Sequence, residues 1–186
     1  VVADMCGLPL ENVEVGIDGC SAPNFAIPLA RAAFGFARLC GPHDLSAERT
    51  DACRRITQSM MAHPEMVAGP GRLDTRLMTA CQGRLVVKGG AEGFQIIGIM
   101  PGVLGADSPG IGIAIKIADG DSDSRSRTDP NSRARPAVAL EVLRQMGVLA
   151  EKDLAGLAEF GPVRQVTNWR KIVVGEIRPA FTLERA

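Results

Sequence analysis

The sequence contains no tyrosine, and aromatic residues make up only 4% of its 186 positions. Its core must therefore be built from aliphatic side chains, alanine and methionine. Charge of one sign is not in excess, because 21 Lys and Arg balance 21 Asp and Glu. A neutral chain argues against nucleic acid or an anionic membrane as the main partner, since both select for a basic face. The hydrophobic fraction of 46% excludes wholesale disorder.

No C-x-x-C pair is present, so the sequence lacks the signature of a zinc knuckle or a dithiol redox motif. The longest apolar stretch, 94–105, is interrupted by Gln95 and Pro101 and is too short to span a bilayer. No charged segment followed by an apolar stretch opens the chain. These absences predict a cytoplasmic protein without membrane contact. The chain starts at Val1 without methionine, so we expect a piece of a longer protein.

Apolar periodicity predicts helices over 28–40, 46–63 and 136–146, with a loop over 67–71. Strands are predicted over 85–88, 94–100, 111–118 and 171–177. The small residues that alternate with isoleucine over 111–118 indicate packing on both faces of that strand. The glycines of 89–93 either join two strands or distort one long strand. Helices followed by antiparallel-looking strands indicate an α+β fold.

The segment 16–24 combines an acid, two glycines, a thiol and a proline between a strand-like stretch and a helix. Polar groups at such a turn are well placed for a site, which makes Asp18 and Cys20 candidates. The plainer alternative is a turn with a solvated Asp18 and a buried Cys20.

The segment 87–93 places Lys88 at the end of an apolar strand, followed by Gly89 and Gly90. Partial desolvation of such a lysine lowers its pKa and lets it shuttle protons. The glycines would let a substrate approach backbone N–H groups that hold an oxyanion. A lysine at a sheet edge before a tight turn is an equally good interpretation. The glycines fit neither G-x-G-x-x-G nor a P-loop, so a nucleotide site is not expected.

Other polar segments give weaker indications. The segment 63–75 holds a histidine, acids and an arginine without metal-ligand spacing, and is either a loop over a site or a plain connection. The acidic tract of the polar loop 119–132 resembles a calcium loop, but Ser124 and Pro130 stand where glycine and glutamate are needed. Trp169 is expected in the core or at its rim. No serine or threonine has a lysine three residues later, and no G-x-S-x-G is present.

Several co-linear motifs resemble the rhizobial-type bacterial L-asparaginases, the asparaginase II family. The motifs are Ile17-Asp18-Gly19-Cys20-Ser21-Ala22-Pro23, His63-Pro64-Glu65-Met66-Val67-Ala68-Gly69, Arg72-Leu73-Asp74-Thr75 and Lys88-Gly89-Gly90-Ala91-Glu92-Gly93. The resemblance continues through Lys116-Ile117-Ala118-Asp119-Gly120-Asp121 to Val174-Gly175-Glu176-Ile177-Arg178-Pro179, so it covers nearly the whole chain.

The resemblance implies a homodimeric amidohydrolase with the serine β-lactamase/glutaminase-like fold, an antiparallel sheet flanked by helices. It would cleave the side-chain amide of L-asparagine through a serine acyl-enzyme. Lys88 matches the lysine of a second Ser-Lys pair and would be catalytic. Cys20 matches one ligand of a zinc ion whose other ligands lie outside this chain. The expected substrate-binding residues are Asp18, Gly89, Gly90, Ala91 and Glu92.

The family's Ser-x-x-Lys nucleophile has no counterpart in this sequence. Residues 1–186 therefore resemble the C-terminal portion of such an enzyme, inactive alone, whose partner is the N-terminal half of the same protein. Two alternatives remain. The chain is a module that binds an amino acid without turnover, or it belongs to a related amidohydrolase acting on glutamine or another amide.

Overall fold

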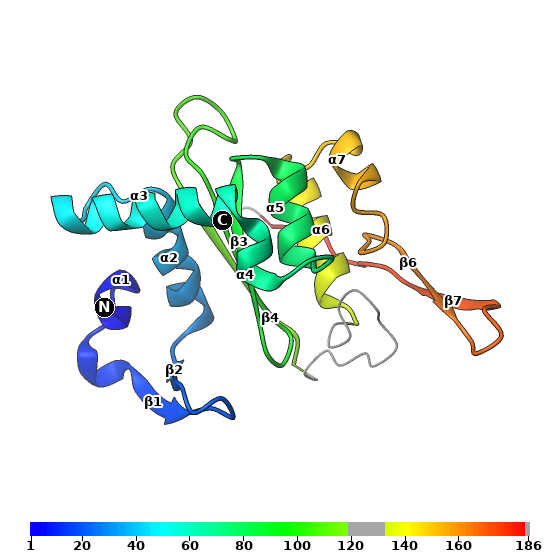
Figure 1. Ribbon diagram of the computed structural model, residues 1–186, viewed down its shortest axis with the longest axis horizontal. Helices are drawn as coiled ribbons and strands as arrows, with labels where there is room; N and C mark the ends of the chain where they lie inside the picture. The colour runs from blue at the N-terminus through cyan, green and yellow to red at the C-terminus, as the bar shows by residue number, and fades with distance from the viewer. Residues whose placement is uncertain (119–132, 185–186) are drawn as a thin grey trace.

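The computed structural model describes residues 1–118 and 133–184 and has the predicted α+β arrangement of helices and small antiparallel sheets (Figure 1). The central sheet has the strand order β3 (Leu85–Gly90), β4 (Phe94–Ile99), β5 (Ile111–Lys116). Each neighbouring pair is antiparallel. The segment after Gly90 thus joins two strands, as in the first of the two predicted alternatives, and does not distort one long strand. The rejected calcium loop lies outside the described residues.

One face of the central sheet carries the main hydrophobic core. The helices α5 (Leu73–Cys81) and α6 (Arg135–Gln145) contribute to it, followed by the short helix α7 (Glu151–Ala155). The odd-numbered positions of the strands supply the sheet side of this core. Its fully buried aliphatic residues include Leu73, Leu77, Leu85, Val87, Ile97, Ile99, Leu140 and Leu143. As the composition predicts, aliphatic side chains dominate, and Phe160 is its one phenylalanine among the described residues.

Helix α2 (Leu29–Cys40) covers the opposite face of the sheet and ends before Gly41 as predicted. It lies so close that a Cβ built at Gly112 would be 1.7 Å from the carbonyl oxygen of Ala33. A Cβ at Gly98 would be 2.4 Å from the Sγ atom of Cys40. Strand β5 is therefore packed on both faces, as its small alternate residues predict.

The long helix α3 (Ala47–Ala62) begins at Ser46, whose Oγ accepts the Arg49 N–H at 3.3 Å. The loop predicted over 67–71 is partly wrong, because residues 67 and 68 belong to helix α4 (Pro64–Ala68). A proline fits the first turn of a helix, and Gly69, with φ +94°, ends this one. No helix in the described part of the chain is long and apolar enough to cross a membrane.

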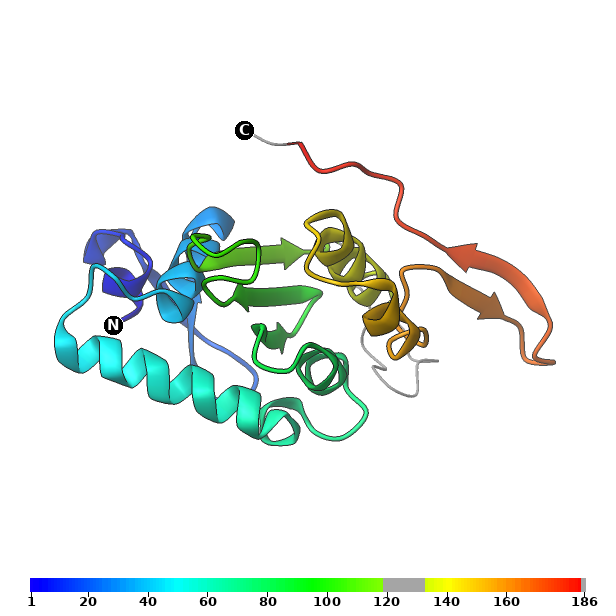
Figure 2. The ribbon, with the colours of Figure 1, turned by 90° about the horizontal axis from the view of Figure 1, so that it is seen from above.

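Two hairpins stand apart from the central sheet (Figures 1 and 2). The first follows the short helices α1 (Val2–Met5) and η1 (Leu10–Asn12) and consists of β1 (Glu14–Ile17) and β2 (Pro23–Ala26). The second, β6 (Arg164–Thr167) and β7 (Val173–Ile177), projects away from the helices. Trp169 lies in the turn of this projecting hairpin and is 96% exposed, so its predicted place in the core or at its rim is wrong.

A buried carboxylate ties α7 to the end of α5. The Oδ2 atom of Asp153 accepts the Ala150 N–H at 2.9 Å and lies 2.9 Å from Nη2 of Arg84. Burial alone would raise the pKa of the Asp153 carboxyl, but these two partners, together with the charge of Lys152, outweigh it and lower the pKa. Asp153 therefore stabilises the fold in its ionised form.

Candidate active site

A polar cleft of about 580 Å³ lies where the turn between β1 and β2, the α4–α5 connection and the β3–β4 hairpin meet. Every site residue predicted from the sequence lines it: Asp18, Cys20, Lys88, Gly89, Gly90, Ala91 and Glu92. These residues come from segments about 70 positions apart in the chain, and folding brings them together. The structure shows that these residues line one cleft, and the role of each residue stays a prediction.

The Asp18 carboxylate shapes the turn that brings it into the cleft. Its Oδ1 atom accepts the N–H groups of Cys20 at 2.8 Å and Ala22 at 3.1 Å. Such side-chain-to-backbone bonds are typical of aspartate in turns, and here they enclose Ser21, which has a φ of +63°. Both Asp18 and Cys20 are exposed, so the alternative with a buried Cys20 is wrong.

Lys88 stands at the border of two clefts. It follows three fully buried residues of β3, yet it is itself exposed, so the described residues do not desolvate it as predicted. Its register opposite Ile96 places it on the sheet face that α2 covers. Its Nζ donates to the Gly89 carbonyl oxygen. The polar cleft lies on one side of this side chain, and an apolar cleft lies on the other.

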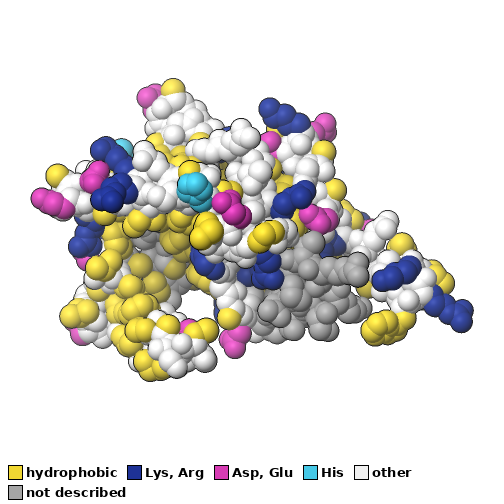
Figure 3. All heavy atoms as spheres, viewed as in Figure 1, with side chains coloured by type: hydrophobic (Ala, Val, Ile, Leu, Met, Phe, Trp, Pro, Cys, Tyr) yellow, Lys and Arg dark blue, Asp and Glu magenta, His cyan; other side chains and the backbone are white. Residues whose placement is uncertain are grey.

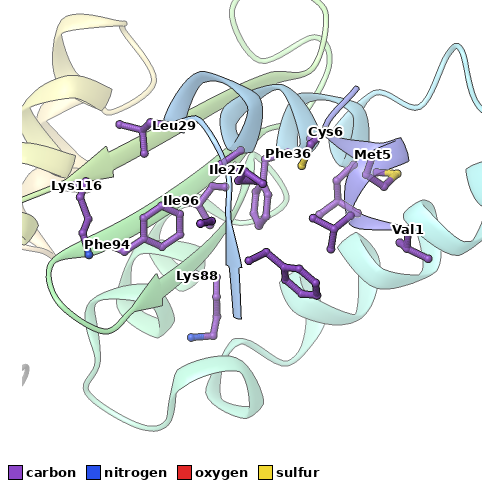
Figure 4. A pocket seen from close by; sticks show the side chains of 16 residues that line it. Val1, Met5, Cys6, Ile27, Leu29, Phe36, Lys88, Phe94, Ile96 and Lys116 are labelled. Carbon is purple, nitrogen blue, oxygen red and sulfur yellow. The ribbon is translucent and has the colours of Figure 1, made fainter. Parts of the chain in front are cut away.

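The apolar cleft has a volume of about 720 Å³ and is enclosed by α1, β2, α2 and the central sheet (Figure 4). Among the described residues, Lys88 and Lys116 are the two charged side chains that line it; Lys88 pairs across the sheet with Ile96, and Lys116 pairs with Phe94. The space-filling view shows hydrophobic side chains gathered over this part of the molecule (Figure 3). A hollow of this size lined by aliphatic and aromatic side chains is an unusual surface for a monomeric protein.

Three buried polar side chains beneath the β3–β4 hairpin escaped the sequence analysis: Asp74, Gln95 and Arg135. Asp74 and Arg135 also line the polar cleft. In the sequence, Asp74 is one residue of a family motif, and Gln95 only interrupts an apolar stretch. Arg135 directly precedes Pro136 and shows no pattern that indicates a functional role. A fully buried glutamine inside an apolar strand is the signal that could have identified the cluster, since buried polar groups need partners.

The segment 63–75 contributes Val67, Ala68 and residues 72–74 to the cleft. The Thr75 hydroxyl holds this connection by donating to the carbonyl oxygens of Gly69 at 2.6 Å and Pro64 at 3.1 Å. His63 is exposed and does not line the cleft, with its Nδ1 3.8 Å from the Glu65 carboxylate. The segment is thus a connection whose end borders the site.

The described residues do not assemble a zinc site. Among them, no group of three or more His, Cys, Asp or Glu side chains could hold a metal ion. A zinc site needs three or four such donors, and Cys20 alone supplies one. The other four cysteines are buried, and burial, followed by repulsion from Cys53, raises the pKa of Cys40 to about 12. The zinc prediction requires ligands from elsewhere, and no chemical step below depends on it.

A family model described as L-asparaginase II matches residues 1–179. A search of curated proteins gives no match to the chain. The family match covers the polar cleft, the apolar cleft and both hairpins.

Proposed function

The chain belongs to the L-asparaginase II family, and we propose that its polar cleft binds L-asparagine and takes part in hydrolysing the side-chain amide to aspartate and ammonia. The observation that carries the proposal is the convergence of all seven predicted site residues on one cleft. Residues that merely shape separate turns would have no reason to converge.

The charges of the cleft support an amino-acid substrate. Arg72, Lys88 and Arg135 supply positive charges, and Asp18, Asp74 and Glu92 supply negative ones. Asparagine is a zwitterion, so it needs an anionic group near its ammonium and a cationic group near its carboxylate. Asp18 and Glu92 are suited to the ammonium, and Arg72 is suited to the carboxylate.

We assign Lys88 to proton transfer in a serine acyl-enzyme mechanism. A serine hydroxyl attacks the side-chain carbonyl of asparagine, and the amine of Lys88 takes the hydroxyl proton and returns it to the departing ammonia. Water then attacks the resulting ester, which releases aspartate and restores the hydroxyl. The backbone at Gly90 and Ala91 lines the substrate carbonyl, whose oxygen carries the developing charge.

We further propose that residues 1–186 form the C-terminal portion of a serine β-lactamase/glutaminase-like domain. Neither cleft is lined by a serine or threonine from the described residues, and we assign the attacking hydroxyl to the N-terminal part of the domain. Strands β3 and β5 each have one edge unpaired by described residues, and both border the apolar cleft. A hydroxyl-bearing N-terminal part that packs there would reach Lys88 and cover apolar surface.

Homodimer formation and zinc binding are the remaining parts of the proposal. The projecting β6–β7 hairpin exposes Val173 and Val174 as well as Trp169, and an isolated two-stranded hairpin is marginally stable in water. A second copy that covers this hairpin would stabilise it. Cys20, exposed at the rim of the polar cleft, would be one zinc ligand.

The decisive experiment measures ammonia release by the complete protein that carries this chain, with asparagine, glutamine and a β-lactam as alternative substrates. Turnover of asparagine in preference to the other two is expected. Preference for glutamine would establish the related amidohydrolase instead. Asparagine binding by calorimetry without ammonia release would refute the enzymatic proposal and leave an amino-acid-binding module.

A further inference from the structure

We propose that Asp74 is a positioning residue for Lys88, acting through the peptide group that joins Lys88 to Gly89. This inference rests on the proposed role of Lys88 and adds a residue to it. Asp74 is 4% exposed and stands in the first turn of α5, where a carboxylate is favoured by the helix dipole. From there it meets the last residues of β3.

The Asp74 carboxylate binds both strands of the β3–β4 hairpin at one register position. Its Oδ2 atom accepts the Gly89 N–H at 2.5 Å, and its Oδ1 atom accepts the Gln95 side-chain N–H at 3.0 Å. Gly89 and Gln95 are cross-strand partners. One carboxylate therefore fixes the position of β3 relative to β4 at the residue that directly follows Lys88.

The buried guanidinium of Arg135 holds the same hairpin from the same sheet face, next to Asp74. Its Nη1 donates to the carbonyl oxygens of Gly90 at 3.1 Å and Phe94 at 2.9 Å, the pair that closes the hairpin. A Cβ at Gly89 would lie 2.9 Å from this Nη1 and 3.3 Å from Oδ2 of Asp74. Glycine at position 89 is thus what lets the two buried charged groups close around the backbone.

The consequence for chemistry concerns the orientation of one peptide plane. The N–H that Asp74 accepts belongs to the peptide that carries the Lys88 carbonyl, so the hydrogen bond sets the direction in which the exposed Lys88 side chain leaves the sheet. Among the described residues, the Gly89 carbonyl oxygen is the one hydrogen-bond acceptor of the Lys88 ammonium. The amine therefore depends on its backbone for its position, and a displacement of about 1 Å can cost about 100-fold in rate.

The test compares Asp74→Ala and Asp74→Asn with Asp51→Ala in the complete protein. Asp51 is exposed on α3 and serves as the matched control. We expect kcat per folded enzyme to fall about 100-fold in Asp74→Ala, with KM within about threefold. In Asp74→Asn, whose amide oxygen still accepts the Gly89 N–H, we expect a loss of about tenfold. A purely structural role would lower the melting temperature but leave kcat per folded enzyme at the control value, which would overturn the proposal.

Hydrogen exchange at the Gly89 amide tests the anchoring independently of turnover. We expect exchange to be at least about tenfold faster in Asp74→Ala, with the Ile97 amide of the central strand unchanged. If Asp74→Ala does not fold, Asp74→Asn takes its place, with a smaller acceleration expected. Unchanged Gly89 exchange overturns the anchoring even if the protein hydrolyses asparagine. Faster exchange in a protein without asparaginase activity upholds the anchoring and refutes only the proposed function.

Discussion

Replacing Lys88 by methionine distinguishes the contribution of its amine from the contribution of its side-chain packing. Methionine keeps an unbranched side chain of similar length against the apolar cleft and removes only the charge and the proton-carrying nitrogen. Lys116 is the matched control, because it lies on the same face of the same sheet and lines the same apolar cleft. Lys88 alone of the two also lines the polar cleft. Lys88→Met and Lys116→Met therefore differ in their access to the substrate and little else.

The expected magnitudes follow from exposure and from the assigned role. Lys88 is exposed, and among the described residues its amine bonds only the neighbouring Gly89 carbonyl, so its loss should change the free energy of unfolding by no more than about 0.5 kcal/mol. A positioned general base contributes roughly 100- to 10,000-fold to a rate. Lys88→Met should therefore lose at least about 100-fold in kcat while unfolding at nearly the same denaturant concentration as Lys116→Met.

Ammonia release under saturating asparagine measures kcat, and urea unfolding of the same preparations measures stability. Equal activity of the two variants would remove Lys88 from the chemistry. A large loss of stability in Lys88→Met alone would show that its effect on activity comes from the fold. Retention of asparagine binding by Lys88→Met, measured by calorimetry, would assign the loss to the chemical step.

Three further predictions concern packing, thiol accessibility and pH. Gly112→Ala should lower the free energy of unfolding by about 3 kcal/mol because α2 leaves no room for a Cβ. Gly175 has open space around it, so Gly175→Ala should lower it by less than about 1 kcal/mol. Similar urea midpoints for the two variants would contradict this prediction. In the native chain one thiol, that of Cys20, should react rapidly with a disulfide reagent, while Cys40 and the other buried thiols react only after unfolding; a second fast thiol would contradict the described burial. Asp153→Asn should cost about 2 kcal/mol at pH 7, and this difference from wild type should shrink as the pH falls through the depressed folded-state pKa; a difference that does not shrink with falling pH would show that ionisation is not its cause.

Local patterns in the sequence predicted most of the secondary structure. Proline and glycine at the ends of α2 and α3 marked their boundaries, and strict alternation identified β5. The loop over 67–71 was predicted from its two glycines and its proline, but Pro64 starts a helix that continues to Ala68. Trp169 was misplaced because its burial depends on which surfaces pack together, and a single hydrophobic residue in a turn carries no information on that.

The cleft was predictable only where its residues form short motifs. Asp18, Cys20 and the glycines after Lys88 stand in unusual local combinations, so they drew attention without a structure. Asp74 and Arg135 are 61 positions apart in the chain and each is ordinary in its own helix. Their pairing around Gly89 depends on α5 and α6 packing on the same sheet face, which no local pattern encodes.

The position of Lys88 between two clefts limits how the reaction can be assembled. Among the described residues, Asp18, Glu92 and Arg72, which suit a zwitterion, line the polar cleft and not the apolar one, so the proposed substrate would approach from that side. The apolar cleft has a volume of about 720 Å³ and is lined by no hydroxyl of the described residues, so it suits a packed protein segment better than a hydrophilic amino acid. A segment seated there would extend a serine past Lys88 into the polar cleft, where its hydroxyl would meet the substrate carbonyl. The amine would then lie beside both the hydroxyl and the departing nitrogen, within reach of each, while the hydroxyl oxygen faces the carbonyl carbon that it attacks.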